Sequence, residues 1–326
     1  MTDFAVLGGG LAGVTLAWRL HGLGASFRVY DRGEPATASR VAAGLLTPVT
    51  GQRPALSWRW VELAAEAFAF YPRVEAVTGA RFFHPGPMVR LFHTPEERVL
   101  MTERGATRFA GHVEVVDDPL DPEAFAMPHG GAVMPHAARL DVPAYLGASH
   151  AFFAGLDSYE QCEVAVTGDI AATLGARHVA FCQGYGANPL FPEVKFAASK
   201  GEILALHIPG LTETRTVNRH GQWLTRVGPA SYRAGATYDR SSLDETPTAA
   251  GRAAILEALA RSLRRPVEVT AHVAAVRPII DVSRPVVMRH AENPAWSYFN
   301  GLGSKGALTA PYFAAELAET LALQRR

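Results

Sequence analysis

The feature that most constrains this sequence is a glycine-rich turn near its start, VLGGGLAGVTLA, which contains Gly8-x-Gly10-x-x-Gly13. The first glycine permits a tight bend, the second lets the backbone approach a pyrophosphate, and the third lets a helix pack closely on a strand. The N-terminus of that helix favours an anion. Asp31 closes the next apolar run, where a carboxylate can accept hydrogen bonds from ribose hydroxyls. The turn therefore predicts a dinucleotide site.

The pattern around the turn predicts a strand, a helix and a second strand. The apolar run Phe4–Leu7 precedes it, Leu11–Leu20 has helical spacing, and Phe27–Tyr30 is a second apolar run. Later in the chain we expect helices over 57–70 (with Pro72 just beyond), 145–153, 248–263 and 309–323 (with Pro311 in its first turn), strands over 82–91, 162–166 and 178–182, antiparallel strands over 200–240, and loops over 117–136.

Charge and composition exclude some classes of function. The 31 basic side chains equal the 31 acidic ones, so there is no bulk electrostatic footprint for nucleic acid or an anionic membrane. No uninterrupted apolar stretch of about 18 residues predicts a membrane span. The start lacks the basic and then apolar pattern of a secretory signal. We therefore expect a cytoplasmic protein with no membrane partner and no nucleic-acid partner.

Metal chemistry is not predicted either. The two cysteines, Cys162 and Cys182, lack the spacing of metal ligands and lie in apolar runs, so we expect buried thiols. The 12 histidines show no HxxxH or other metal spacing.

The glycine turn alone leaves NAD and FAD open as cofactors, and the segment after the second strand favours FAD. Residues 39–48, SRVAAGLLTP, form a run of small residues that resembles the flavin-contacting stretch of the D-amino-acid oxidase superfamily. The resemblance implies FAD contacts at the turn and in this segment: Gly8, Gly10, Leu11, Ala12, Gly13, Asp31, Arg32, Ser39, Ala43, Gly44 and Leu45, with Val164 and Gly184 from the middle of the chain.

Motifs in the second half extend the resemblance to the whole chain. The run NGLGSKG at 300–306, leading into a final helix, resembles the C-terminal flavin loop of the superfamily. The segment VRPIID at 276–281, followed by Arg284-Pro285, resembles its Arg-Pro segment, and KGE at 200–202 with GATY at 235–238 resembles strands of glycine-oxidase-like members. The resemblance adds Gly301, Gly303, Ser304, Lys305, Gly306 and Arg277 to the expected cofactor contacts.

Within the superfamily, the GLGSKG and AAGLLTPVTG segments are most similar to the oxidase domain of the bifunctional enzymes that modify the tRNA wobble uridine. Two positions depart from the family pattern. The strand before Gly184 ends in FCQG, where an Ala-Thr or Ala-Gly ending is common, and Met288 stands where a glycine is usual.

The resemblance implies a fold and a division of the chain. The expected class is α/β, with a Rossmann-like FAD-binding domain of the glutathione-reductase type and an interleaved substrate domain on a mixed or antiparallel sheet. We expect the FAD-binding domain to comprise 1–50, 137–198 and 270–326, and the substrate domain 51–136 and 199–269.

The implied activity is that of an FAD-dependent oxidoreductase acting on a small amine or amino acid. A hydride passes from the carbon beside the nitrogen to flavin N5, water hydrolyses the imine, and oxygen or another acceptor takes the electrons. Arg277 is expected to clamp a substrate carboxylate, with an ion pair to Asp281 as the alternative. Lys305 is expected near the flavin, and the strands that cover the flavin carry Trp223, Arg226 and Tyr238.

Three other functions stay open. One is a dehydrogenase of the same fold with a quinone or protein acceptor, the second is a tRNA wobble-uridine side-chain oxidase, and the third is a non-catalytic FAD-binding protein.

Overall fold

The computed structural model describes residues 1–280 and 284–323. Its first sheet has six strands in the order β11-β2-β1-β12-β19-β18, all parallel except β18, which runs antiparallel to β19. The central strands are buried on both faces, which explains their unbroken apolar runs. The strands are β1 (Thr2–Leu7), β2 (Phe27–Asp31), β11 (Tyr159–Gln161), β12 (Ala176–Phe181), β18 (Val286–Arg289) and β19 (Trp296–Asn300).

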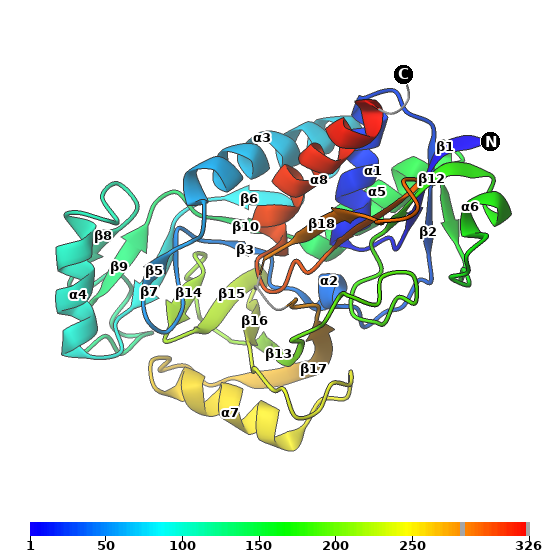
Figure 1. The fold of residues 1–326 in the computed structure, drawn as a ribbon. Helices are drawn as coiled ribbons and strands as arrows, with labels where there is room; N and C mark the ends of the chain where they lie inside the picture. Colours follow the sequence, from blue (N-terminus) through cyan, green and yellow to red (C-terminus); the bar gives the residue numbers. More distant parts are fainter. Residues whose placement is uncertain (281–283, 324–326) are drawn as a thin grey trace.

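Long helices from distant parts of the chain gather over this sheet (Figure 1). They are α1 (Leu11–Gly22), α3 (Trp60–Thr78), α5 (Val142–Gly155) and α8 (Gly306–Ala322), and they share one apolar core with β1 and β2. A buried hydrogen bond joins α1 to α5: Trp18 donates its Nε1–H to Ser149 Oγ at 2.8 Å. A second core on the other face includes residues of the short α6 (Ile170–Thr173).

The second sheet has eight strands in the order β17-β13-β16-β15-β14-β7-β9-β8 and is antiparallel apart from the β7–β14 pair. The helix α7 (Ala249–Ala260) contributes to an apolar core with this sheet, and α4 (Pro95–Gly105) lies beside β8. The strands are β7 (Met88–Leu91), β8 (Glu114–Val116), β9 (Gly131–Met134), β13 (Ser199–His207), β14 (Val217–Arg219), β15 (Gln222–Gly228), β16 (Ser231–Gly235) and β17 (Glu268–Arg277).

Short elements connect the two sheets. The helix α2 lies against both α5 and β17. Two small sheets, β3-β10-β6 and β4-β5, complete the fold. The elements are α2 (Ala38–Val41), β3 (Leu45–Leu46), β4 (Val49–Thr50), β5 (Ala55–Leu56), β6 (Phe83–Pro85) and β10 (Ala138–Leu140).

The expected α/β class and most expected elements are confirmed, and four expectations about elements are wrong. Residues 162–166 form no strand, since β11 ends at Gln161, and β9 lies within the segment expected to be loops. The helix expected to end near Phe70 continues through Pro72 to Thr78, because burial of Tyr71 and Val74 on its inner face favours continuation.

The last helix begins at Gly306, so Pro311 lies in its second turn rather than its first. Proline has no N–H, which leaves the carbonyl four residues earlier without its helical partner. That carbonyl belongs to Ala307, and it accepts a hydrogen bond of 2.8 Å from the Tyr71 hydroxyl of α3. A tertiary contact therefore replaces the missing bond. Among the residues that the structure describes, no helix is both long and apolar enough to cross a membrane.

Candidate functional site

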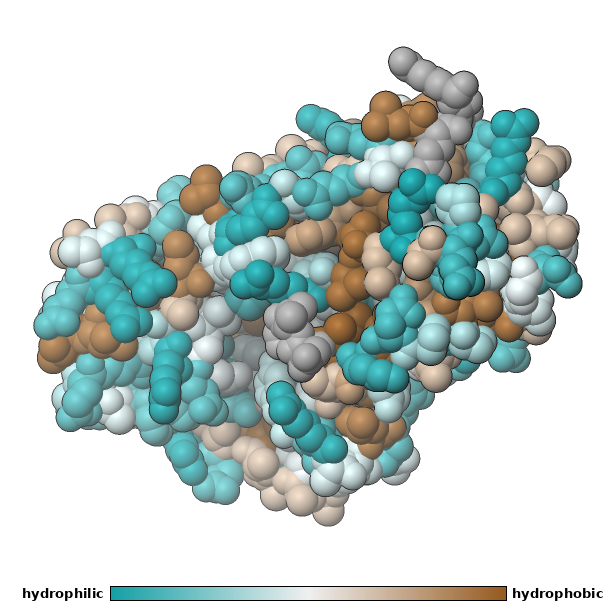
Figure 2. Space-filling view, viewed as in Figure 1, coloured by the Kyte–Doolittle hydropathy of each residue, from teal (hydrophilic) through white to brown (hydrophobic). Residues whose placement is uncertain are grey.

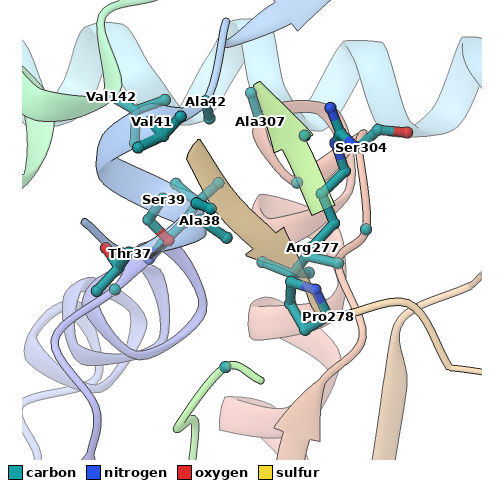
Figure 3. A pocket seen from close by; sticks show the side chains of 18 of the residues that line it. Thr37, Ala38, Ser39, Val41, Ala42, Val142, Arg277, Pro278, Ser304 and Ala307 are labelled. Carbon is teal, nitrogen blue, oxygen red and sulfur yellow. Dashed lines mark hydrogen bonds between the residues drawn. The ribbon is translucent and has the colours of Figure 1, made fainter. Parts of the chain in front are cut away.

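A cavity of about 890 Å³ extends between the six-stranded and the eight-stranded sheets. It begins at the carboxyl ends of β1, β2 and β12, which is where open parallel sheets bind ligands. The space-filling view, seen from the same side as Figure 1, shows a recess near the middle of the molecule (Figure 2). In close-up, Thr37 and Ser39 lie on one side of the cavity, Arg277 and Pro278 on another, and Ser304 near the start of α8 (Figure 3). The volume falls in the range of ligand and cofactor sites.

The glycine turn borders one end of the cavity. Gly8 has φ +103°, and a Cβ there would lie 2.4 Å from the carbonyl oxygen of Cys182. A Cβ on Gly13 would lie 1.9 Å from the Gly8 oxygen, so the strand, turn and helix approach too closely for any side chain. Gly10 precedes α1 and lines the cavity without a side-chain cap. The geometry is that of a cradle for a pyrophosphate at a helix N-terminus.

Asp31 is held beside this turn at the end of β2. Its Oδ1 accepts a hydrogen bond of 3.1 Å from the Gly9 amide, and its Oδ2 accepts one of 3.5 Å from the Tyr159 hydroxyl. Burial raises the pKa of Tyr159 to about 12, so the phenol keeps the proton that it donates. The carboxylate is therefore held on the cavity wall beside the glycine turn.

Two residues that support this end were not predicted from the sequence. His150 Nε2 lies 2.8 Å from the Gly9 oxygen, and its ring stacks on Tyr159 with the centroids 4.4 Å apart. Burial lowers the pKa of His150, which favours a neutral ring that donates Nε2–H to Gly9. No local motif marks either residue, because they lie 141 and 128 positions from Gly9 and Asp31.

Arg277 ends β17 at another wall of the cavity. Its Nη1 donates hydrogen bonds to the carbonyl oxygens of Thr237 (3.1 Å) and Lys200 (3.3 Å), and its guanidinium carbon lies 4.2 Å from the centre of the Tyr238 ring. A Cβ on Gly201 would lie 1.9 Å from Nη2, so the guanidinium lies directly over that glycine. Burial lowers the pKa of Arg277.

The charge on Arg277 is not neutralised by its neighbours. Within residues 1–280 and 284–323, no carboxylate forms an ion pair with it. The alternative partner, Asp281, lies outside the described residues. A half-buried guanidinium without a carboxylate partner is suited to bind an anionic ligand.

Lys305 occupies the N-cap of α8, in the loop that follows β19. Its Nζ lies 2.9 Å from Ser57 Oγ, and the Ser57 hydroxyl donates to the Thr47 carbonyl at 2.7 Å. Burial lowers the pKa of Lys305 to about 8. The Gly303 amide donates to the Pro278 carbonyl at 3.2 Å, which places this loop beside the segment that follows Arg277.

All but three of the site residues predicted from the sequence line the cavity; the exceptions are Gly13, Gly301 and Arg226. Gly13 and Gly301 have backbone roles, since each lies where a Cβ would clash. Arg226 donates instead to the Gly228 carbonyl at 3.1 Å. Side chains alternate along a strand, so Arg226 lies on the face opposite Trp223, which is 8% exposed and lines the cavity. Cavity residues that were not predicted include Thr47, Gln52, Ser57, Met88 and Asn218.

Comparisons with known proteins agree with this architecture. The family model of the DAO family, described as FAD dependent oxidoreductase, matches residues 3–320. Glycine oxidase of Bacillus licheniformis is 24% identical, over 95% of this chain and 90% of that protein. The structure of glycine oxidase from Bacillus cereus has a TM-score of 0.81 at 20% identity, covering 100% of this chain and 96% of the other. Iminodiacetate oxidase from Chelativorans sp. BNC1 has a TM-score of 0.78 at 18% identity, covering 97% and 94%.

The family match covers nearly the whole chain, and the cavity has the glycine cradle and the fixed carboxylate that a dinucleotide needs. The chain therefore belongs to the DAO family of FAD-dependent oxidoreductases.

Proposed function

We propose that this enzyme oxidises a small amine or amino acid that carries a carboxylate. The observation that carries the proposal is Arg277, a half-buried cation on the cavity wall with no carboxylate partner among the described residues. A planar guanidinium binds a carboxylate through two parallel hydrogen bonds. The stacked Tyr238 ring and the two carbonyls at Nη1 hold the guanidinium in one orientation.

The residues of the glycine turn are proposed to hold the cofactor. Gly10 and the start of α1 receive the pyrophosphate, and Asp31 receives the ribose. FAD, when bound, supplies the acceptor for the hydride that leaves the substrate. The positive end of α8, with the amides near Gly306, borders the cavity and would stabilise negative charge that builds on a bound flavin during reduction. Trp223 lines the cavity from β15, and its buried indole would shield a bound substrate from water.

The relatives support the same substrate class. Their names give glycine and iminodiacetate as substrates, and each of these molecules contains an amine nitrogen and a carboxylate. We also propose the domain division predicted above, with 1–50, 137–198 and 270–326 binding FAD and 51–136 and 199–269 facing the substrate. Oxygen is the proposed acceptor, and a cytoplasmic location remains part of the proposal.

An anaerobic screen tests the proposed function. The purified, FAD-loaded enzyme is mixed with glycine, N-methylglycine, iminodiacetate, larger amino acids, neutral amines and hydroxy acids, and the oxidised flavin absorbance is followed. Amines with a carboxylate should remove this absorbance faster than neutral amines of similar size. Reduction by hydroxy acids alone, or by none of these compounds, would contradict the proposal. Reoxidation of the reduced enzyme in air then distinguishes oxygen from a quinone or protein acceptor.

A further inference from the structure

An amine substrate that binds as an ammonium ion must give up a proton before it can lose a hydride. Near neutral pH most amine substrates are ammonium ions. The nitrogen must recover its lone pair before the neighbouring carbon can release a hydride, because the lone pair stabilises the cation that forms. A side chain within reach of the substrate nitrogen, with a pKa near the working pH, is suited to accept that proton.

Lys305 has the environment of such a group. Its side chain is half-buried at the N-cap of α8, where the positive end of the helix dipole disfavours an ammonium ion. Among the described residues no carboxylate forms an ion pair with it, and burial lowers its pKa to about 8. Lys305 can therefore exist as a neutral amine under mildly alkaline conditions.

Ser57 orients this amine. The Ser57 hydroxyl gives its proton to the Thr47 carbonyl, so its oxygen accepts a hydrogen from Lys305. A neutral lysine amine has two N–H groups and one lone pair. Because one N–H is directed to Ser57, the lone pair does not bind Ser57 and remains available to the cavity that Lys305 lines.

We propose that Lys305 is the general base that takes a proton from the substrate ammonium, and that Ser57 is the residue that positions it. The inference rests on the proposed function. In the step, one substrate N–H bond breaks and its electron pair stays on the substrate nitrogen. The proton forms a new bond with Lys305 Nζ, so the substrate becomes a neutral amine and Lys305 an ammonium ion.

The position of Lys305 relative to Arg277 suits this step. The hydrogen bond from Gly303 to Pro278 places the two segments side by side, and both side chains line one cavity. An α-amino acid has its nitrogen one carbon away from its carboxylate, so a substrate carboxylate on Arg277 keeps that nitrogen inside the cavity that Lys305 also lines. The other charged side chains that line the cavity are Asp31, Arg32, Glu34, Glu163 and Glu245. Further titratable groups on its wall are His220, Tyr30, Tyr185, Tyr238, Cys162 and Cys182, and none of all these contributes to the lowered pKa of Lys305.

The kinetic test compares Lys305→Met with the parent enzyme over a range of pH, using anaerobic flavin reduction by the best amine of the screen. In the parent, kcat/KM should rise about tenfold per pH unit up to pH 8 and then level. In Lys305→Met it should fall about a hundredfold or more at pH 8 and recover as the pH approaches the pKa of the free substrate amine. Lys195→Met, which removes an exposed lysine outside the cavity, is the matched control and should leave the profile unchanged.

A binding measurement gives a readout that needs no turnover. The probe 2-aminoisobutyrate has an amine and a carboxylate but no hydrogen on the carbon beside nitrogen, so it cannot be oxidised. Its affinity, measured by perturbation of the flavin spectrum, should weaken about tenfold per unit below pH 8 in the parent but not in Lys305→Met. Isobutyrate, which lacks the amine, should show no such weakening.

Ser57→Ala keeps the test decisive if Lys305→Met fails to fold or load FAD. Loss of the orienting hydroxyl should lower kcat and shift the pH at which the profile levels, and Ser57→Thr should restore both. Parallel pH profiles for the parent and both variants would overturn the role of Lys305. If no amine reduces the parent enzyme at any pH, the proposed function fails instead.

Discussion

At the scale of single residues, Arg277 shows how a charge can be half-buried without an ion pair. Carbonyl oxygens and the Tyr238 ring solvate part of the guanidinium, and the absence of a side chain at Gly201 makes room for it. The carbonyls hold Nη1, while the rest of the fork is not committed to a carboxylate among the described residues. Such an arrangement favours recognition of a ligand over stabilisation of the fold.

Truncation of Arg277 should therefore weaken substrate oxidation more than it weakens flavin binding. We expect Arg277→Ala to remain yellow but to lose roughly a hundredfold or more in kcat/KM for carboxylate-bearing amines, because a charge-assisted pair is lost. Neutral amines should be affected less. Gly201→Ala should reproduce part of this defect, since its methyl group would displace Nη2. Loss of FAD from Arg277→Ala, or equal losses for both substrate classes, would make Arg277 structural.

At the scale of elements, the strand–turn–helix unit of β1 and α1 shows where glycine is required. Gly8 and Gly13 are needed for close backbone contacts, whereas Gly22 at the far end of α1 has nothing within 4 Å of an added Cβ. The same helix thus contains glycines with opposite expected responses to substitution.

We expect Gly10→Val to give colourless or unstable protein, because its side chain would occupy the path of the pyrophosphate. Gly22→Ala should keep full flavin content and gain up to about 1 kcal/mol of stability from helix propensity. Flavin absorbance per protein and the thermal midpoint measure both effects. A Gly10→Val variant that loads FAD fully would show that the turn does not bind the pyrophosphate.

A buried histidine on the central strand β12 should make the stability of the fold depend on pH. Burial lowers the pKa of His178 to about 4, and its Nε2 lies 2.9 Å from Ser297 Oγ on β19. Between pH 6.5 and 4 the unfolded chain binds a proton that the folded chain does not, so stability is complete above pH 6.5 and falls by up to about 3 kcal/mol as the pH drops to 4. His178→Gln should reduce this slope in denaturant titrations. An unchanged slope would show that other groups cause the loss.

At the scale of the whole molecule, the cavity lies between two sheets that have separate apolar cores. A cofactor that contacts both walls stabilises both parts at once. At a free FAD concentration one hundred times Kd, linkage contributes about 2.7 kcal/mol. We expect the unfolding midpoint of the flavin-free protein to rise with added FAD as one transition, measured by calorimetry. Two separate transitions, of which FAD moves only one, would show that the cofactor does not join the sheets.

Local motifs were sufficient to predict some parts of the molecule and not others. The glycine turn and Asp31 could be predicted because their geometry depends on adjacent residues. The supports of Asp31 could not, since Tyr159 comes from a strand more than a hundred residues away. The prediction for Arg226 neglected strand alternation, which the sequence itself contains. The start of α8 was misplaced because the compensation for Pro311 comes from Tyr71 of another helix.

The order of strands in the first sheet has a consequence for synthesis on the ribosome. Chains leave the ribosome N-terminus first, yet β12 requires β19 as its neighbour, and the loop of Lys305 follows β19. A nascent chain that has not yet released this last segment presents the glycine turn beside an unpaired edge of β12. The cavity is therefore incomplete until β19 and the loop after it have left the ribosome, and interrupted translation before that point leaves an exposed edge that promotes aggregation.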